Sequence, residues 1–91
     1  MDDLLIKARK LLKEAFPPPA RIRLEENTGI SGVVTSARFR GMEFRDRQEL
    51  LWQALDAKLG PNERKHVSII LAFTPEEERF KAELDGAVNG Q

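Results

Sequence analysis

The 91-residue sequence contains no cysteine and no tyrosine, and it has only one histidine and one tryptophan. Without cysteine the chain cannot form a disulfide, a thiolate metal ligand or a thiolate nucleophile. No apolar run approaches the roughly 20 residues that a membrane-spanning helix needs. The N-terminal residues Met1–Leu4 lack the basic and apolar segments of a signal peptide. We therefore expect a cytoplasmic protein that does not associate with membranes.

The charges of the sequence are balanced, because 15 lysines and arginines oppose 15 aspartates and glutamates. A net charge of zero disfavours strong non-specific binding to nucleic acid, although local basic patches remain. The apolar share of 41% and the charged share of 33% are typical of a globular domain. At this length we expect one domain over residues 1–86, followed by a frayed tail over residues 87–91.

Apolar periodicity predicts three helices and three strands. The helices are expected over residues 3–16, 44–59 and 75–86, and the strands over residues 21–26, 31–38 and 67–73. Asn27-Thr28-Gly29 is a turn signal, so the first two strands should form an antiparallel hairpin. A helix separates the second strand from the third, which allows these two strands to pair in parallel.

The predicted fold class is therefore α+β, with a three-stranded mixed sheet and helices packed mainly on one face. The order is helix, strand, strand, helix, a short helical turn at 62–65, strand and helix. Phe44 is expected to face the core beside Leu51 and Leu55. The third strand is apolar on nearly every position, so we expect both of its faces to be well covered. Thr74 and Glu77 have the spacing of a helix capping box.

Four arginines fall within ten residues around Gly41: Arg38, Arg40, Arg45 and Arg47. Arginines at a glycine turn that leads into a helix could bind a phosphate backbone. The alternative is a solvated surface that Glu43 and Asp46 partly neutralise. No aromatic residue is clearly placed to stack on a base, which favours the second interpretation.

His66 is the only histidine, and it directly follows Arg64 and Lys65 at the start of the third strand. An imidazole there could bind iron, zinc or copper, provided that a partner or cofactor supplies the other ligands. The alternative is an ordinary surface histidine.

Glu76, Glu77 and Glu78 form the acidic first turn of a helix and face no obvious base or nucleophile. The sequence therefore predicts no enzyme.

Several short motifs occur in a set order and spacing over about residues 1–80. Phe16-Pro17 closes the first helix, and Val33–Gly41 contains a strand followed by a serine, a phenylalanine and a glycine. Arg47, Leu51 and Trp52 lie on the next helix, and the last two motifs are His66-Val67-Ser68-Ile69 and Thr74-Pro75-Glu76-Glu77. In this order and spacing, the motifs resemble those of the BolA family.

The resemblance implies a type-II KH-like fold and no enzymatic activity. BolA-like proteins pair with monothiol glutaredoxins and help to handle a bridging two-iron two-sulfur cluster. On this basis His66 would be one cluster ligand, and this chain alone would bind no cluster. Residues 25–32, where many members carry a second ligand, contain neither histidine nor cysteine.

Two functions follow as predictions. The first is an adaptor that meets a monothiol glutaredoxin through the edge at His66 and the surface from Arg38 to Arg47, in iron–sulfur handling or stress-responsive regulation. The alternative is a KH-like nucleic-acid binder, such as a DNA-binding transcriptional regulator. The predicted contact residues for a partner or nucleic acid are Arg38, Arg40, Gly41, Arg45, Arg47, Arg64 and Lys65.

Overall fold

The computed structural model describes residues 2–89, with side chains for residues 3–85. It contains four α-helices and three strands, and a short 3₁₀ helix, η1, covers Ala37–Phe39. The helices are α1 (Asp2–Ala15), α2 (Phe44–Asp56), α3 (Pro61–Arg64) and α4 (Pro75–Asn89). The strands are β1 (Arg21–Glu26), β2 (Ile30–Thr35) and β3 (Val67–Phe73).

The strands form one mixed sheet in the order β1-β2-β3. β1 and β2 are antiparallel, with Arg23 opposite Val33. β2 and β3 are parallel, with Val33 opposite Leu71. The chain returns between these parallel strands through α2 and α3, so the predicted hairpin and the predicted crossover are both confirmed.

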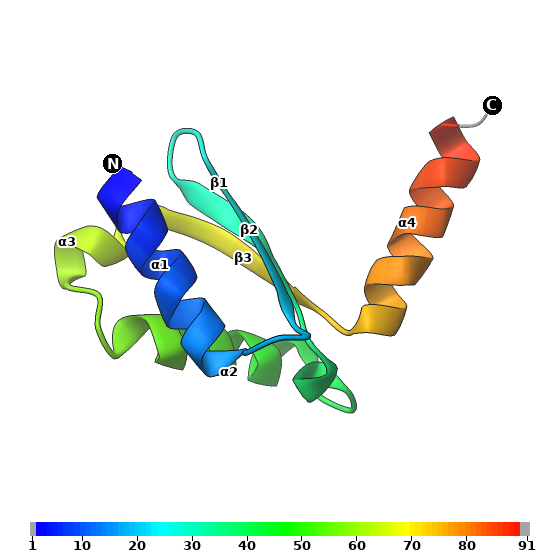
Figure 1. Cartoon of the computed structure of the whole chain (residues 1–91), viewed down its shortest axis with the longest axis horizontal. Coiled ribbons are helices and arrows are strands. Elements are labelled where there is room, and N and C mark those ends of the chain that lie inside the picture. The colour runs from blue at the N-terminus through cyan, green and yellow to red at the C-terminus, as the bar shows by residue number, and fades with distance from the viewer. Residues whose placement is uncertain (1, 90–91) are drawn as a thin grey trace.

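Helices α1 and α2 cover the same face of the sheet (Figure 1). Each helix contributes an apolar stripe to one continuous core, including Ala8 and Leu12 of α1 and Leu51 and Leu55 of α2. The rings of Phe16 and Phe39 lie 5.2 Å apart at a tilted angle and are fully buried. This pair joins the end of α1 to the segment that leaves β2.

Three element ends differ from the sequence prediction by three residues, and the other differences are of one residue. β2 ends at Thr35 rather than Arg38, because the Ser36 hydroxyl accepts a hydrogen bond from the Arg38 backbone N–H and caps η1. α2 ends at Asp56, three residues before the buried Leu59. α4 continues through Gly86 to Asn89, since a glycine without a following proline costs a helix only about 1 kcal/mol. Residues 90 and 91 of the predicted tail lie outside the described residues.

The second face of the sheet is open, so the prediction that both faces of β3 are covered was wrong. Ile69 is 55% exposed, and Leu71 and Phe73 are only half-buried. The prediction of a core position for Phe44 was also wrong, because this ring is 65% exposed. Both long apolar stripes pack on the other face, and α4 projects away from the sheet after its first turn (Figure 1). Within residues 2–89, none of the helices combines the length and apolar character that crossing a bilayer requires.

The contrast between two phenylalanines tests this arrangement. We expect Phe39→Ala to lower the free energy of unfolding by about 3–5 kcal/mol, because it opens a cavity in the core. Phe44→Ala should change it by less than about 0.5 kcal/mol, because the ring is exposed. Urea unfolding followed by Trp52 fluorescence measures both values. Equal losses for the two variants would contradict the arrangement.

Candidate functional site

The predicted contact residues fall into two groups at opposite ends of β3. His66, with Arg64 and Lys65, directly precedes the strand, whereas the arginine segment around Gly41 follows the far end of β2. Because β2 and β3 are parallel, the far end of β2 lies beside the far end of β3. The seven residues of β3 span about 20 Å. His66 and the arginine segment therefore lie at opposite ends of the sheet.

His66 is exposed at a hollow of 310 Å³ between the β1–β2 turn and the start of β3. Its backbone is fixed, because its carbonyl accepts from the Ile30 N–H at 2.7 Å and its N–H donates to the Glu63 carbonyl at 3.1 Å. Gly29 allows the turn to close against β3. A Cβ at this position would lie 2.5 Å from the Ser68 hydroxyl and 3.0 Å from the His66 carbonyl.

The two basic neighbours of His66 differ in their availability. The guanidinium of Arg64 lies 3.8 Å from the centre of the Trp52 ring, and its Nε donates to the Asp56 carboxylate at 2.9 Å. Stacking and pairing hold this side chain over α2. Lys65 is exposed beside the imidazole. Lys65 is therefore the more accessible cation next to His66.

Among the residues that line the hollow, His66 is the one whose side chain is of a type that iron–sulfur clusters accept as a ligand. A two-iron two-sulfur cluster takes four protein ligands, usually thiolates, with imidazole as an accepted replacement. Besides His66, the hollow is lined by Glu26, Asn27 and Thr28, which offer the oxygen atoms that hard cations prefer. Nowhere in the described part of the chain do three or more histidine, aspartate or glutamate side chains gather as a metal site.

The arginine segment at the other end of the sheet turns at Gly41, which has a φ of +77°. Arg38 Nη1 donates to the Ala15 carbonyl at 2.6 Å, and its guanidinium lies 5.1 Å from the centre of the Phe16 ring. Arg45 is exposed in the first turn of α2. Within residues 3–85, neither of these exposed side chains forms an ion pair with a carboxylate.

The other arginines of this region bind the first turn of α4. Successive helix residues point about 100° apart, so three consecutive carboxylates can reach three different elements. Glu76, Glu77 and Glu78 do this. Their partners are Arg40 for Glu76, Arg47 for Glu77, and Arg21 together with Arg23 for Glu78.

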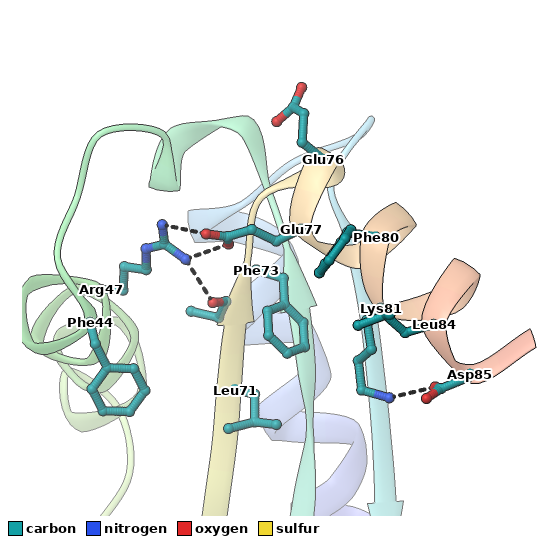
Figure 2. Close-up of a pocket in the computed structure, with 11 residues that line it drawn as sticks. Phe44, Arg47, Leu71, Phe73, Glu76, Glu77, Phe80, Lys81, Leu84 and Asp85 are labelled. Atoms are coloured by element: carbon teal, nitrogen blue, oxygen red, sulfur yellow. Dashed lines mark hydrogen bonds and ion pairs between the residues drawn. The ribbon is translucent and has the colours of Figure 1, made fainter. Parts of the chain in front are cut away.

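Arg47 makes the most buried of these contacts. Its side chain is only 12% exposed. It donates to both carboxylate oxygens of Glu77, at 2.6 and 3.1 Å, and to the Ala72 carbonyl (Figure 2). Its Nε donates to the Met42 carbonyl at 3.0 Å. Glu77 also closes the predicted capping box with Thr74, at 2.9 and 3.1 Å. One guanidinium therefore joins α2, β3 and α4.

These pairings lower the carboxylate pKa values. The side-chain hydrogen bond from Arg40 is the largest cause that lowers the pKa of Glu76 from its ordinary 4.5 to about 2. The hydrogen bond from Arg47, followed by the Thr74 backbone N–H, lowers the pKa of Glu77. The sequence alone identified these glutamates only as a helix first turn. The sequence hinted at these ion pairs only through its equal numbers of acidic and basic residues, 15 of each, which left every charged side chain without an assigned partner.

Comparison with known proteins bears on the fold. No protein-family model matches the chain, and neither does any curated protein sequence. Among solved structures, BolA1 from Arabidopsis thaliana superposes with a TM-score of 0.68 at 22% identity, covering 81% of this chain and 94% of that one. A bol-like protein from Babesia bovis gives a TM-score of 0.63 at 22% identity, covering 82% and 88%. The chain has the BolA fold.

The residues that carry the resemblance have structural roles in this BolA fold. Ser36 caps η1, Phe39 fills the core, and Gly41 adopts the left-handed turn. Arg47 fixes the start of α4. His66 differs from them, because its imidazole is exposed and no hydrogen bond of this side chain is found among the described residues.

A second surface of the BolA-like domain escaped the sequence prediction. A groove of 590 Å³ opens along the free edge of β3 between α2 and α4. Figure 2 shows Phe44, Leu71, Phe73, Phe80 and Leu84 around it. The sequence hinted at this groove only through Phe80 and Leu84, which are four residues apart and so lie on one face of a helix.

The ion pairs of α4 are tested by titration. We expect Arg40→Gln to return the pKa of Glu76 from about 2 towards 4.5, because the principal hydrogen bond to the carboxylate is lost. Since the folded pKa is depressed, the pair stabilises the fold above about pH 4.5 and is lost as the pH falls towards 2. Carboxyl ¹³C NMR measures the pKa. Arg45→Gln is the control and should leave it unchanged.

Proposed function

We propose that this chain is a non-enzymatic BolA-like interaction module, which meets a monothiol glutaredoxin at His66 and supplies one ligand to a bridging two-iron two-sulfur cluster. The supporting observation is the position of His66, an exposed imidazole on a fixed backbone at the mouth of β3. A rigid backbone lowers the entropy cost of presenting a ligand to a partner. The cluster is cargo shared with the partner.

The role of the chain in such a complex follows from its ligand set. His66 supplies one nitrogen, and thiolates from the partner would supply the softer ligands that iron–sulfur clusters prefer. The hollow beside His66, bordered by the β1–β2 turn, has room for a partner group. The exposed Lys65 adds a positive charge next to this position, which suits a complex whose thiolates carry negative charge.

A spectroscopic titration tests this proposal. Adding the chain anaerobically to a cluster-loaded monothiol glutaredoxin should change the visible absorption and circular dichroism, because a nitrogen ligand replaces a sulfur ligand or solvent. His66→Ala should abolish the change. Glu26→Ala, at the same hollow, should preserve it. An unaltered spectrum with the natural chain, or an equal change with His66→Ala, would refute the proposal.

Nucleic-acid binding through the turn at Gly41 is a second candidate, supported by the exposed Arg38 of η1 and the exposed Arg45 in the first turn of α2. It has weaker support, because Glu76 and Glu77 already pair with Arg40 and Arg47. True phosphate contacts give a logarithmic salt slope of about −0.9 per contact on duplex DNA.

The salt dependence of DNA affinity tests this second candidate. Arg38→Gln with Arg45→Gln should reduce the slope by about 2 if both side chains contact phosphate. Lys58→Gln, which removes an exposed cation beyond the end of α2, should leave the slope unchanged. A flat slope for the natural chain would eliminate the candidate.

A further inference from the structure

The exposed apolar side chains of this chain gather on one side of the molecule. Among residues 3–85, five large apolar side chains are at least half exposed, and four of them lie around α4 and the open sheet face: Phe44, Ile69, Phe80 and Leu84. The fifth, Ile6, is on α1. Contiguous apolar surface of this kind marks a binding site.

α4 and the open sheet face form a wedge with two apolar walls. Phe80 and Leu84 provide the wall on α4, and Leu71 and Phe73 provide the wall on β3. A second hollow of 240 Å³ continues past Val33 on the neighbouring strand. α4 is held at its first turn by ion pairs, and beyond this turn it projects away from the sheet (Figure 1). The apolar surfaces of helix and sheet therefore face a space that their own contacts leave open.

The charges of the chain are divided in a way that suits a second copy. α4 carries five acidic and two basic residues, a net charge of −3, whereas residues 1–75 carry a net charge of +3. On the open face, Arg21 and Arg23 share the single carboxylate of Glu78 and remain 68% and 72% exposed. Within residues 3–85, four of the five α4 carboxylates pair with basic side chains of the same chain, so Glu83 is the one left to meet an arginine of the open face in another molecule.

The available carboxylate on α4 lies next to the apolar pair. Glu83 is three residues from Phe80 and adjacent to Leu84, so it flanks the same helix face. Within residues 3–85 it forms no ion pair. On the sheet, Arg23 lies in register with Val33, which in turn lies in register with Leu71. The apolar face of α4 with Glu83 beside it therefore matches the row of Leu71 and Val33 on the sheet, which ends at Arg23.

We propose that this surface is a self-association site, in which α4 of each copy lies on the open sheet face of the other. Such a reciprocal contact has twofold symmetry and closes as a dimer. A 15-residue helix is about 22 Å long and about 10 Å wide, so two such contacts bury on the order of 1,000 Å². This area is at the lower limit for a specific interface, and the dimer should dissociate in the micromolar range.

Sedimentation of the full chain at increasing concentration tests the proposal. The natural chain should change from monomer to dimer. Phe80→Glu with Leu84→Glu should weaken the dimer at least tenfold, because carboxylates replace its apolar contacts. Ile6→Glu is the matched control, since Ile6 and Phe80 are equally exposed at 62%, and it should leave the dimer unchanged. A natural chain that stays monomeric overturns the proposal, as does a dimer that Phe80→Glu with Leu84→Glu leaves intact.

A mixing experiment identifies the occupant of the sheet face. Ile69→Lys with Leu71→Lys should also prevent self-association, and Ile69→Lys alone replaces this pair if circular dichroism shows a loss of fold. When the helix variant and the sheet variant are mixed, one of the two contacts is the natural one and the other sets glutamates against lysines, so a heterodimer should form although neither variant dimerises alone. Absence of the heterodimer would mean that α4 covers its own sheet or pairs with another α4, and it overturns the proposal.

Discussion

Parallel hydrogen bonding between β2 and β3 requires the chain to return along the sheet, and α2 makes this return on the face that α1 also covers. Both amphipathic helices are thereby committed to one core, in which Phe16 and Phe39 close the end nearest the arginine segment. The opposite face is left to α4, whose apolar residues do not reach it. The parallel pairing of β2 with β3 thus has two results: it places both helices in one core, and it leaves the other face of the sheet open.

Ion pairs hold the first turn of α4, whereas the burial of apolar side chains holds the rest of the fold together. Arg47, nearly enclosed, positions the first turn through Glu77, while Glu76 and Glu78 extend the attachment to the Gly41 turn and to β1. These pairs neutralise much of the basic cluster that resembled a phosphate site. His66, at the start of β3, lies away from these pairs with an exposed imidazole, and this position is the basis of the proposed adaptor function.

The fold class and strand order followed from the sequence, because period-two and period-3.6 apolar patterns and the turn at Asn27–Gly29 are local signals. β1 and β3 even have the predicted bounds. The prediction that Phe44 and both faces of β3 are buried was wrong, because an apolar residue does not reveal which face of a sheet the helices cover. Two features could not be predicted: the distance between His66 and the arginines, and the glutamate–arginine pairs. Both depend on contacts between residues about 20 to 60 positions apart, which no local pattern contains.

Nuclear Overhauser contacts between β2 and β3 test the central claim most directly, because this pairing separates His66 from the arginine segment. The account predicts contacts of Ile30 with Val67 and of Thr35 with Phe73, and none between Thr35 and Val67. Contacts between Thr35 and Val67 would indicate antiparallel strands. They would bring the Gly41 turn beside His66 and contradict the account.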